Sequence, residues 1–438
     1  MTSWYARHAW LGPAGFARDV LLEAADGRFT AVTPGVAVQP PQAIRLDGLV
    51  LPGLANTHSH AFHRALRGRT HDGGGSFWTW RDRMYDVAGR LDPDSYHALA
   101  RAAYAEMALA GVTCVGEFHY LHHGPDGTAY ADPNAMGAAL IAAAGEAGVR
   151  ITLLDALYLT SSVAGAPLEG VQRRFGDGDL DGWSARTDEL TGLPHARIGA
   201  ALHSVRAVPA RCLTDFAGRT RGRPVHLHLS EQPAENDQCR AVHGCTPTRL
   251  LEQHGVLAGH VTAVHATHPS VDDVTTLGAT GTGVCLCPST ERDLADGIGP
   301  ARALADAGSP LSLGSDSHAV IDMFEEARGV ESHERLRTRR RGHFTAHELL
   351  TAASTAGHAA LGWADAGAIA VGAHADLVAV RLDSVRTAGV DPAGAVFAAT
   401  AADVSHVVAG GRLVVADGRH VAVDVPAALR DAIAAVLR

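Results

Sequence analysis

Short apolar runs alternate with longer amphipathic segments through most of the chain. The runs are nearly continuous in apolar residues, which is typical of parallel strands covered on both faces. The segments between them have helical periodicity, and one of these, at 94–111, ends at a glycine. The predicted strands lie at 49–60, 111–118, 149–157, 196–205, 223–231, 260–268, 282–289 and 310–317.

This alternation favours an α/β fold, a (β/α)8 TIM barrel at residues 51–370, over the alternative of an open doubly wound sheet. The two ends of the chain have a different pattern, since residues 1–50 and 371–438 alternate apolar and polar positions between glycine turns. Neither end is long enough to bury a core alone. We therefore expect them to combine into one small β-sandwich domain beside the barrel.

Composition excludes several kinds of chemistry. All 37 residues counted as lysine or arginine are arginines, so the chain has no Schiff-base lysine, no P-loop lysine and no carbamylated lysine that could bridge two metals. The 47 acidic residues give a formal net charge of −10, which argues against a nucleic acid or an anionic membrane as a partner.

Cysteine usage and the start of the chain predict the compartment. The first residues lack the basic segment and apolar core of a signal peptide, and the six cysteines form neither zinc knuckles nor a disulfide framework. We expect reduced, mostly buried thiols in a cytoplasmic protein. Cys285 and Cys287 alternate on a predicted strand and are interpreted as core residues.

Polar residues interrupt the predicted strands mainly at their carboxyl ends, the rim on which TIM barrels build active sites. His58 and His60 end the first strand and share a face, because side chains alternate along a strand. The fifth strand carries His226 and His228, and the spacing alone does not choose between them as ligands. Glu231 follows that strand and is a candidate acid or base.

Two later strands add further candidates. His265, followed by His268, ends the sixth strand, and Asp316 ends the eighth. Three imidazoles and a carboxylate with room for water make a mononuclear hydrolytic site for zinc or a similar divalent ion. Such an ion lowers the pKa of water to about 7 and polarises the carbon under attack. Because no lysine can bridge a second ion, we expect one metal ion per subunit.

These segments together resemble the amidohydrolase superfamily, in its one-metal deaminase branch, over essentially the whole chain. The general motifs are LPGLANTHSH (51–60), HLHLSE (226–231), HATH (265–268), GSDS (314–317) and GAHADLVAV (372–380). Four more specific segments are similar to the formimidoylglutamate deiminases within that superfamily: HSHAFHRAL (58–66), SFWTWRDRMY (76–85), EFHYLHH (117–123) and LHSVRAV (202–208).

The resemblance implies a role for each candidate and a homodimer as the assembly. His265 contacts the attacking water or the developing tetrahedral centre, Asp316 accepts the proton of that water, and Glu231 binds the amidine and shuttles protons to the departing ammonia. The implied metal ligands are His58, His60, His228 and Asp316. The implied substrate pocket contains Arg81, Tyr120, His203 and Arg206.

The implied reaction converts N-formimino-L-glutamate and water to N-formyl-L-glutamate and ammonia, a step of histidine degradation. Carboxylates of this anionic substrate call for arginine. Arg206 follows the fourth strand and Arg81 lies in the first loop, with a surface salt bridge as the alternative role for both, while Glu231 fits the cationic amidine. A deaminase of a purine or other ring substrate is the alternative among enzymes. A barrel without catalysis is the alternative outside them, and the complete ligand set opposes it.

One residue departs from the family's pattern. His63 stands after HSHAF, where glutamine is expected. Both side chains can donate a hydrogen bond, so a contact to a substrate carboxylate can survive, but the exact substrate can also differ. Glycines 73–75, before Ser76, are either a candidate hinge or a plain flexible loop.

Overall fold

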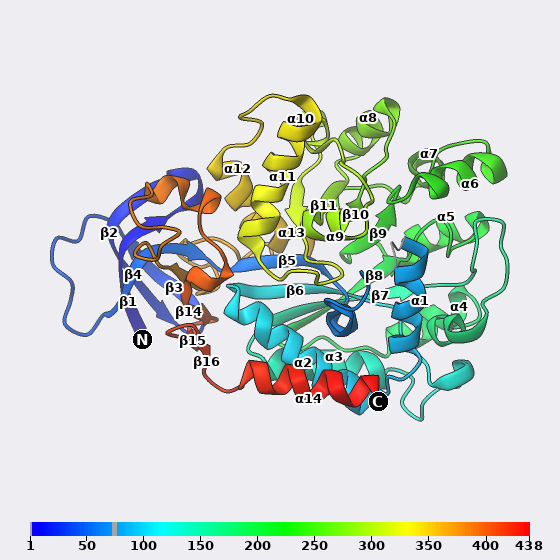
Figure 1. The fold of residues 1–438 in the computed structure, drawn as a ribbon, viewed down its shortest axis with the longest axis horizontal. Coiled ribbons are helices and arrows are strands. Elements are labelled where there is room, and N and C mark those ends of the chain that lie inside the picture. Colours follow the sequence, from blue (N-terminus) through cyan, green and yellow to red (C-terminus); the bar gives the residue numbers. More distant parts are fainter. Residues whose placement is uncertain (1, 72–76) are drawn as a thin grey trace.

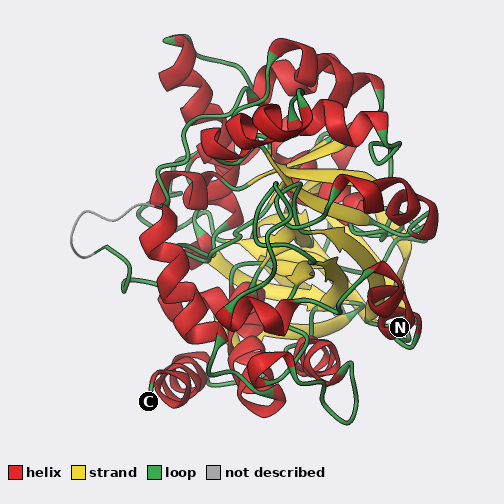
Figure 2. Ribbon diagram, turned by 90° about the vertical axis from the view of Figure 1, so that its right-hand side faces the viewer, coloured by secondary structure: helices red, strands yellow, loops and turns green. Residues whose placement is uncertain are grey.

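The computed structural model describes residues 2–71 and 77–438, and two sheets form among them, each with eight strands. The strands of one sheet are all parallel and lie inside a ring of helices (Figure 2). Every residue of its strands β5, β6 and β7 is buried, as the continuous apolar runs predict. This sheet contains β5 (Leu54–Ser59), β6 (Val112–His119), β7 (Arg150–Leu157), β8 (Ala196–Leu202), β9 (Val225–Leu229), β10 (Val261–His265), β11 (Gly283–Leu286) and β12 (Leu311–Leu313).

The parallel sheet closes on itself between its first and last strands. Neighbouring strands follow chain order from β5 to β12, and a parallel bridge joins Ser59 to Asp316 just beyond β12. The Asp316 N–H donates to the His58 carbonyl at 3.0 Å, and the His60 N–H donates to the Asp316 carbonyl at 3.3 Å. The fold is therefore the predicted TIM barrel, and the alternative of an open sheet is wrong.

Helices connect the strands and cover the outside of the barrel (Figure 1). At the start of α2 the Asp92 carboxylate accepts from the Ser95 N–H at 2.8 Å, the Ser95 hydroxyl accepts from the Asp92 N–H at 2.9 Å, and Pro93 occupies the first turn. The helices are α1 (Phe77–Ala88), α2 (Pro93–Leu109), α3 (Ala135–Glu146), α4 (Leu180–Asp188), α5 (Ala210–Arg219), α6 (Pro233–His243), α7 (Pro247–Gln253), α8 (Val271–Ala279), α9 (Pro288–Asp293), α10 (Ala301–Ala307), α11 (Met323–Thr338), α12 (Ala346–Thr351), α13 (Gly357–Ala360) and α14 (Val425–Leu437).

The second sheet is built from both ends of the chain, as predicted, and lies beside the barrel (Figure 1). It is mixed, because β1 pairs parallel with β4 and antiparallel with β2. The chain then ends in α14, which lies along α2 (Figure 1). The strands, in spatial order, are β16 (Arg419–His420), β15 (Arg412–Ala416), β14 (Val404–Ala409), β13 (Leu377–Val380), β4 (Ile44–Pro52), β1 (Thr2–Trp10), β2 (Phe16–Ala25) and β3 (Arg28–Thr33).

The predicted strand at 49–60 is two strands, which belong to different sheets. It breaks at Gly53, whose N–H donates to the Asp376 carbonyl at 3.1 Å. A Cβ at this position would lie 2.2 Å from Thr113 Oγ1, so only glycine fits where the chain passes from one sheet to the other. The first predicted strand is therefore wrong in extent, although its end carries the expected histidines.

A buried ion pair connects the two sheets. Arg150, at the start of β7, donates from Nη1 to Asp376 Oδ1 at 3.1 Å, and the Gly410 N–H donates to the same carboxylate at 2.8 Å. Arg150 is 6% exposed and Asp376 is 1% exposed, so water screens this pair little. The pair holds the barrel to the sheet formed by the two ends of the chain.

All six cysteines are free, and four of them are buried. Among the residues that the structure describes, no helix is long and apolar enough to cross a membrane.

Candidate active site

A pocket at the carboxyl ends of the barrel strands brings the predicted residues together. Its floor carries the candidate metal ligands, and its walls carry aromatic side chains of α1 and of the loops after β6 and β7. His58 lies fully buried beneath it. The other predicted site residues all line the pocket: His60, His63, Arg81, Tyr120, His203, Arg206, His228, Glu231, His265 and Asp316.

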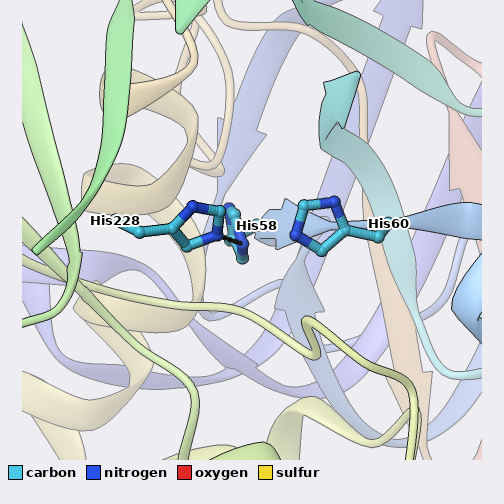
Figure 3. A group of neighbouring side chains, drawn as sticks. All are labelled: His58, His60 and His228. Atoms are coloured by element: carbon cyan, nitrogen blue, oxygen red, sulfur yellow. Dashed lines mark hydrogen bonds between the residues drawn. The ribbon is translucent and has the colours of Figure 1, made fainter. Parts of the chain in front are cut away.

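Three imidazoles and one carboxylate converge at the pocket floor. His58 Nε2 lies 3.2 Å from His228 Nε2 and 3.4 Å from Asp316 Oδ1, and His60 Nε2 lies 3.5 Å from the same oxygen. The three imidazole rings converge (Figure 3), with ring centroids 4.8 Å apart for His58 and His60, 5.0 Å for His58 and His228, and 5.6 Å for His60 and His228. Ligand atoms around a tetrahedral zinc ion are separated by about 3.4 Å, so these spacings fit a divalent ion.

Backbone carbonyls orient two of these imidazoles. His60 Nδ1 lies 2.9 Å from the Phe118 carbonyl oxygen, and His228 Nδ1 lies 2.9 Å from that of His203. A carbonyl only accepts, so each Nδ1 carries the hydrogen and each Nε2 turns its lone pair toward the cluster. The tautomers required for a metal site are thus set by the barrel backbone.

The structure resolves the choice between the two histidines of β9. His226 lies one residue pair deeper in the barrel, where its Nε2 donates to the Ala360 carbonyl at 3.1 Å and burial lowers its pKa to about 3. His228 is the one that reaches the cluster. His268 also lies outside it, since its Nε2 is hydrogen-bonded to the Asp296 carbonyl at 2.7 Å.

Several site residues have a left-handed backbone. The φ angle is 50° at Ser230, 70° at His265 and 42° at Asp316, each at or just beyond the end of a barrel strand. Non-glycine residues adopt this conformation at an energetic cost, and they concentrate at functional sites. The left-handed residues His265 and Asp316 line the pocket themselves, and Glu231, which follows Ser230, lines it as well.

Charged groups surround His265. Its Nε2 lies 3.6 Å from Asp316 Oδ2 and 3.8 Å from Glu231 Oε1, and its Nδ1 lies 3.5 Å from Glu291 Oε1. Burial opposes its charge, but the three carboxylates outweigh burial and raise the pKa of His265 well above its usual value. Burial also raises the pKa of Glu231. For Asp316, the hydrogen bond from His58 and the nearby imidazoles outweigh burial and lower the pKa.

Two carboxylates of the site escaped the sequence reasoning. Glu291 contacts His265 from α9, and its Oε1 accepts from the Cys287 N–H at 2.9 Å. Glu235 lines the pocket from α6, accepts from the Ser230 N–H at 2.9 Å, and has a pKa that burial raises to about 7. Both lie on helices. A search for polar residues at the carboxyl ends of the predicted strands therefore could not find them.

Two guanidinium groups face the pocket without an anion hydrogen-bonded to them among the described residues. Arg81, on α1, lies 4.5 Å from the centroid of the Trp78 ring and 5.4 Å from that of Tyr85. Arg206 follows β8. Among the described residues neither guanidinium forms an ion pair, and the buried Nε atoms of both lack a hydrogen-bond partner. Such cations are ready to bind an anionic ligand.

His63 lies between the metal cluster and the aromatic wall. Its Nε2 lies 3.0 Å from the Tyr120 hydroxyl, and its ring centroid is 4.5 Å from that of His60 and 5.1 Å from that of Trp80. Burial lowers its pKa to about 3, so the imidazole is neutral. His203 also belongs to the wall, with its Nδ1 3.3 Å from the Ser204 hydroxyl.

The candidate hinge at glycines 73–75 lies outside the residues that the structure describes.

Comparisons with known proteins agree with this geometry. The chain is 37% identical over 439 residues to formimidoylglutamate deiminase of Pseudomonas aeruginosa, covering 96% of both chains. It is 29% identical to 5-methylthioadenosine/S-adenosylhomocysteine deaminase of Natronomonas pharaonis (94% of this chain and 92% of the relative). It is also 30% identical to 8-oxoguanine deaminase of Pseudomonas aeruginosa (90% and 89%).

Solved structures show the same fold. The crystal structure of an amidohydrolase from Brucella melitensis superposes with a TM-score of 0.93 at 34% identity, covering 100% of both chains. An adenosine deaminase from Xanthomonas campestris with bound zinc superposes with a TM-score of 0.84 at 24% identity, covering 99% of this chain and 97% of the other. The model of the amidohydrolase family matches residues 49–414. The chain therefore belongs to the amidohydrolase family.

Proposed function

We propose that this amidohydrolase hydrolyses the amidine of N-formimino-L-glutamate to N-formyl-L-glutamate and ammonia, a step of histidine degradation. The observation that carries the proposal is the pair of unpartnered guanidiniums, Arg81 and Arg206, in the pocket that also contains the metal cluster. A substrate with two carboxylates supplies the anions that both lack. The resemblance to formimidoylglutamate deiminase supports the same substrate.

The residues of the pocket divide the work of this reaction. His58, His60, His228 and Asp316 are the ligands for one divalent ion, with zinc fitting their nitrogen and oxygen atoms. When bound, this ion supplies Lewis acidity, which activates water and polarises the amidine carbon. Arg81 and Arg206 bind the substrate carboxylates bidentately and so fix the amidine over the pocket floor.

Protons move through three side chains. Asp316 accepts a proton from the attacking water at Oδ2, the oxygen that faces His265. The positively charged His265 stabilises the tetrahedral centre as its C–O bond forms. Glu231 donates a proton to the amidine nitrogen, the C–N bond breaks and ammonia leaves. The formyl C=O forms as the hydroxyl of the tetrahedral centre returns a proton to Glu231, and the proton on Asp316 leaves to solvent. Burial raises the pKa of Glu231, which suits a group that must hold this proton before donating it.

The direct test is ammonia release by enzyme loaded with one divalent ion per subunit. We expect turnover of N-formimino-L-glutamate and none of N-formimino-glycine, which lacks the second carboxylate. The matched comparison is a ring substrate of the guanine or cytosine type, because 8-oxoguanine deaminase is also a relative and the pocket wall is aromatic. Turnover of the ring substrate without turnover of N-formimino-L-glutamate would favour the alternative function and overturn the proposal.

A further inference from the structure

The two oxygens of Asp316 face different groups of side chains. Oδ1 lies 3.4 Å from His58 Nε2 and 3.5 Å from His60 Nε2, within the histidine cluster. Oδ2 lies 3.6 Å from His265 Nε2, outside that cluster. A carboxylate in this position can bind one cation with each oxygen, and the second oxygen has ligand-type neighbours of its own.

A thiol completes this second group. The ligand atoms of His265, Cys287 and Asp316 all lie within 4.8 Å of one another, and all three residues are buried. Glu231 Oε1 adds an oxygen 3.8 Å from His265 Nε2. The distances from His265 to the two carboxylates are close to the separation of about 3.4 Å between ligands of a tetrahedral zinc ion. Cys287 is therefore more than the core residue that its strand position suggests.

We propose that the pocket contains a second metal site, formed by His265, Cys287 and Asp316 with Glu231 beside them, which binds a thiophilic divalent cation, Zn²⁺ or Cd²⁺, and inhibits the enzyme. Binding replaces the S–H bond of Cys287 and the Nε2–H bond of His265 with bonds to the cation, and releases both protons to solvent. Nitrogen, oxygen and thiolate donors together select zinc-like ions over Mg²⁺ or Ca²⁺.

Inhibition follows from which atoms the second ion occupies, and this part rests on the proposed function. The ion would take Asp316 Oδ2, which accepts the proton of the attacking water, and His265 Nε2, which stabilises the tetrahedral centre. It would also hold Glu231, which protonates the leaving nitrogen. Excess zinc is then expected to stop the reaction while the histidine cluster remains occupied.

Another buried cluster has similar residue types but cannot bind a cation. His119, His122 and Asp155 also lie within ligand distance of one another. However, Asp155 accepts from both Nη atoms of Arg186, at 2.9 and 2.8 Å, and from Trp183 Nε1 at 3.1 Å. Both oxygens of Asp155 are thus already bound to the Arg186 guanidinium, whose positive charge would repel a metal ion. Among the described residues, no guanidinium forms an ion pair with Asp316 or Glu231 in the group around Cys287.

The test titrates Cd²⁺ into enzyme that already holds one divalent ion per subunit. Ultraviolet absorption from thiolate-to-cadmium charge transfer and the metal content after gel filtration are measured together. We expect one further equivalent to bind, with the charge-transfer band, and excess Zn²⁺ to abolish ammonia release. The variant Cys287→Ala should keep the first ion and its activity, lack the band, and need at least about tenfold more Zn²⁺ for the same inhibition.

The variant Cys285→Ala is the matched control, because it removes the neighbouring thiol of the same core cluster and should retain the band and the inhibition. The site would be overturned if the wild-type enzyme held only one divalent ion per subunit in total after the titration. A charge-transfer band that persists in Cys287→Ala would overturn it as well. A second equivalent without loss of turnover would overturn its inhibitory role. The absorption and metal readouts use no substrate, so they stay interpretable even where N-formimino-L-glutamate is not turned over.

Discussion

Glu231 and Glu235 are two buried carboxylates of one pocket, and their surroundings give them different tasks. Glu231 lies 3.8 Å from His265, whereas Glu235 bonds to the backbone N–H of Ser230. We expect Glu231→Gln to lower kcat by about 10²- to 10⁴-fold, because glutamine cannot transfer the proton to the leaving nitrogen. Metal content, measured by mass spectrometry, should not change, since Glu231 is not a ligand of the histidine cluster.

The control for this prediction is Glu235→Gln. The pKa of Glu235 is raised to about 7, so near neutral pH glutamine imitates a form of the side chain that is already well populated. We expect kcat to change by much less than in Glu231→Gln. Equal losses in the two variants would contradict a proton-transfer role specific to Glu231.

The proposed function requires Arg206 to bind a carboxylate of the substrate. Its truncation in Arg206→Ala should raise KM for N-formimino-L-glutamate by about 100-fold, because removing one partner of a buried charge pair costs roughly 2–5 kcal/mol. Arg197→Ala is the control, since Arg197 stacks on Trp363 outside the pocket. Steady-state kinetics of both variants would decide the matter, and an unchanged KM in Arg206→Ala would count against the proposed substrate.

Among the elements, α2 shows how a local sequence signal sets a boundary. Its reciprocal hydrogen bonds between Asp92 and Ser95 satisfy backbone N–H groups of the first turn. We expect Asp92→Ala to lower the free energy of unfolding by about 1 kcal/mol. Asp94→Ala, in the same turn but without a capping role, should change it much less. Urea denaturation of both variants measures the difference, and kcat/KM should be unaffected.

Near the end of the chain, Asp403 shapes the turn η7 (Ala401–Asp403), which leads into β14. Burial tends to raise its pKa, but hydrogen bonds from Arg386, at 2.9 Å, and from the Thr400 N–H, also at 2.9 Å, outweigh burial and lower the pKa to about 2. A carboxyl group with a depressed pKa stabilises the fold above its unfolded pKa of about 4, and this contribution is lost as the pH falls toward 2.

We therefore expect Asp403→Asn to reduce stability at pH 7 by about 1 kcal/mol, a value discounted because Arg386 is partly exposed to water. The difference between variant and wild type should shrink as the pH is lowered through the range from about 4 to 2. Thermal or urea unfolding of both proteins as a function of pH provides the measurement. A difference that grows in acid would show that the carboxylate does not stabilise the turn in this way.

The helices and strands were predictable from the sequence where neighbouring residues along the chain determine them. Burial on both faces produces continuous apolar runs, so the barrel strands and the rim that carries His58, His265 and Asp316 were recognisable. The spacing alone did not choose His228 over His226, because both side chains share a face and only depth along the barrel separates them; the family resemblance was needed to imply His228. The position of Glu291 was hidden as well, since it depends on how α9 turns back over the pocket.

At the scale of the whole molecule, Arg150 and Asp376 couple the barrel to the sheet formed by the two ends of the chain. We expect Arg150→Met to reduce the free energy of unfolding by about 3–5 kcal/mol, because Asp376 would remain charged and buried without its partner. The double variant Arg150→Met with Asp376→Leu should regain much of this loss. Chemical denaturation of the single and double variants tests the expectation, and additive losses would contradict it.

The bridge between Ser59 and Asp316 gives the barrel a seam that lies inside the catalytic pocket. On one side of the seam the strand ends in His58 and His60, and on the other side lies Asp316. An ion bound by these side chains would therefore cross-link the first and last strands of the barrel. Opening the barrel at this point would separate the candidate ligands, and an ion bound by them would add to the backbone hydrogen bonds that already close the seam. The candidate metal ligands and the backbone groups that close the barrel thus belong to the same short segments of the chain.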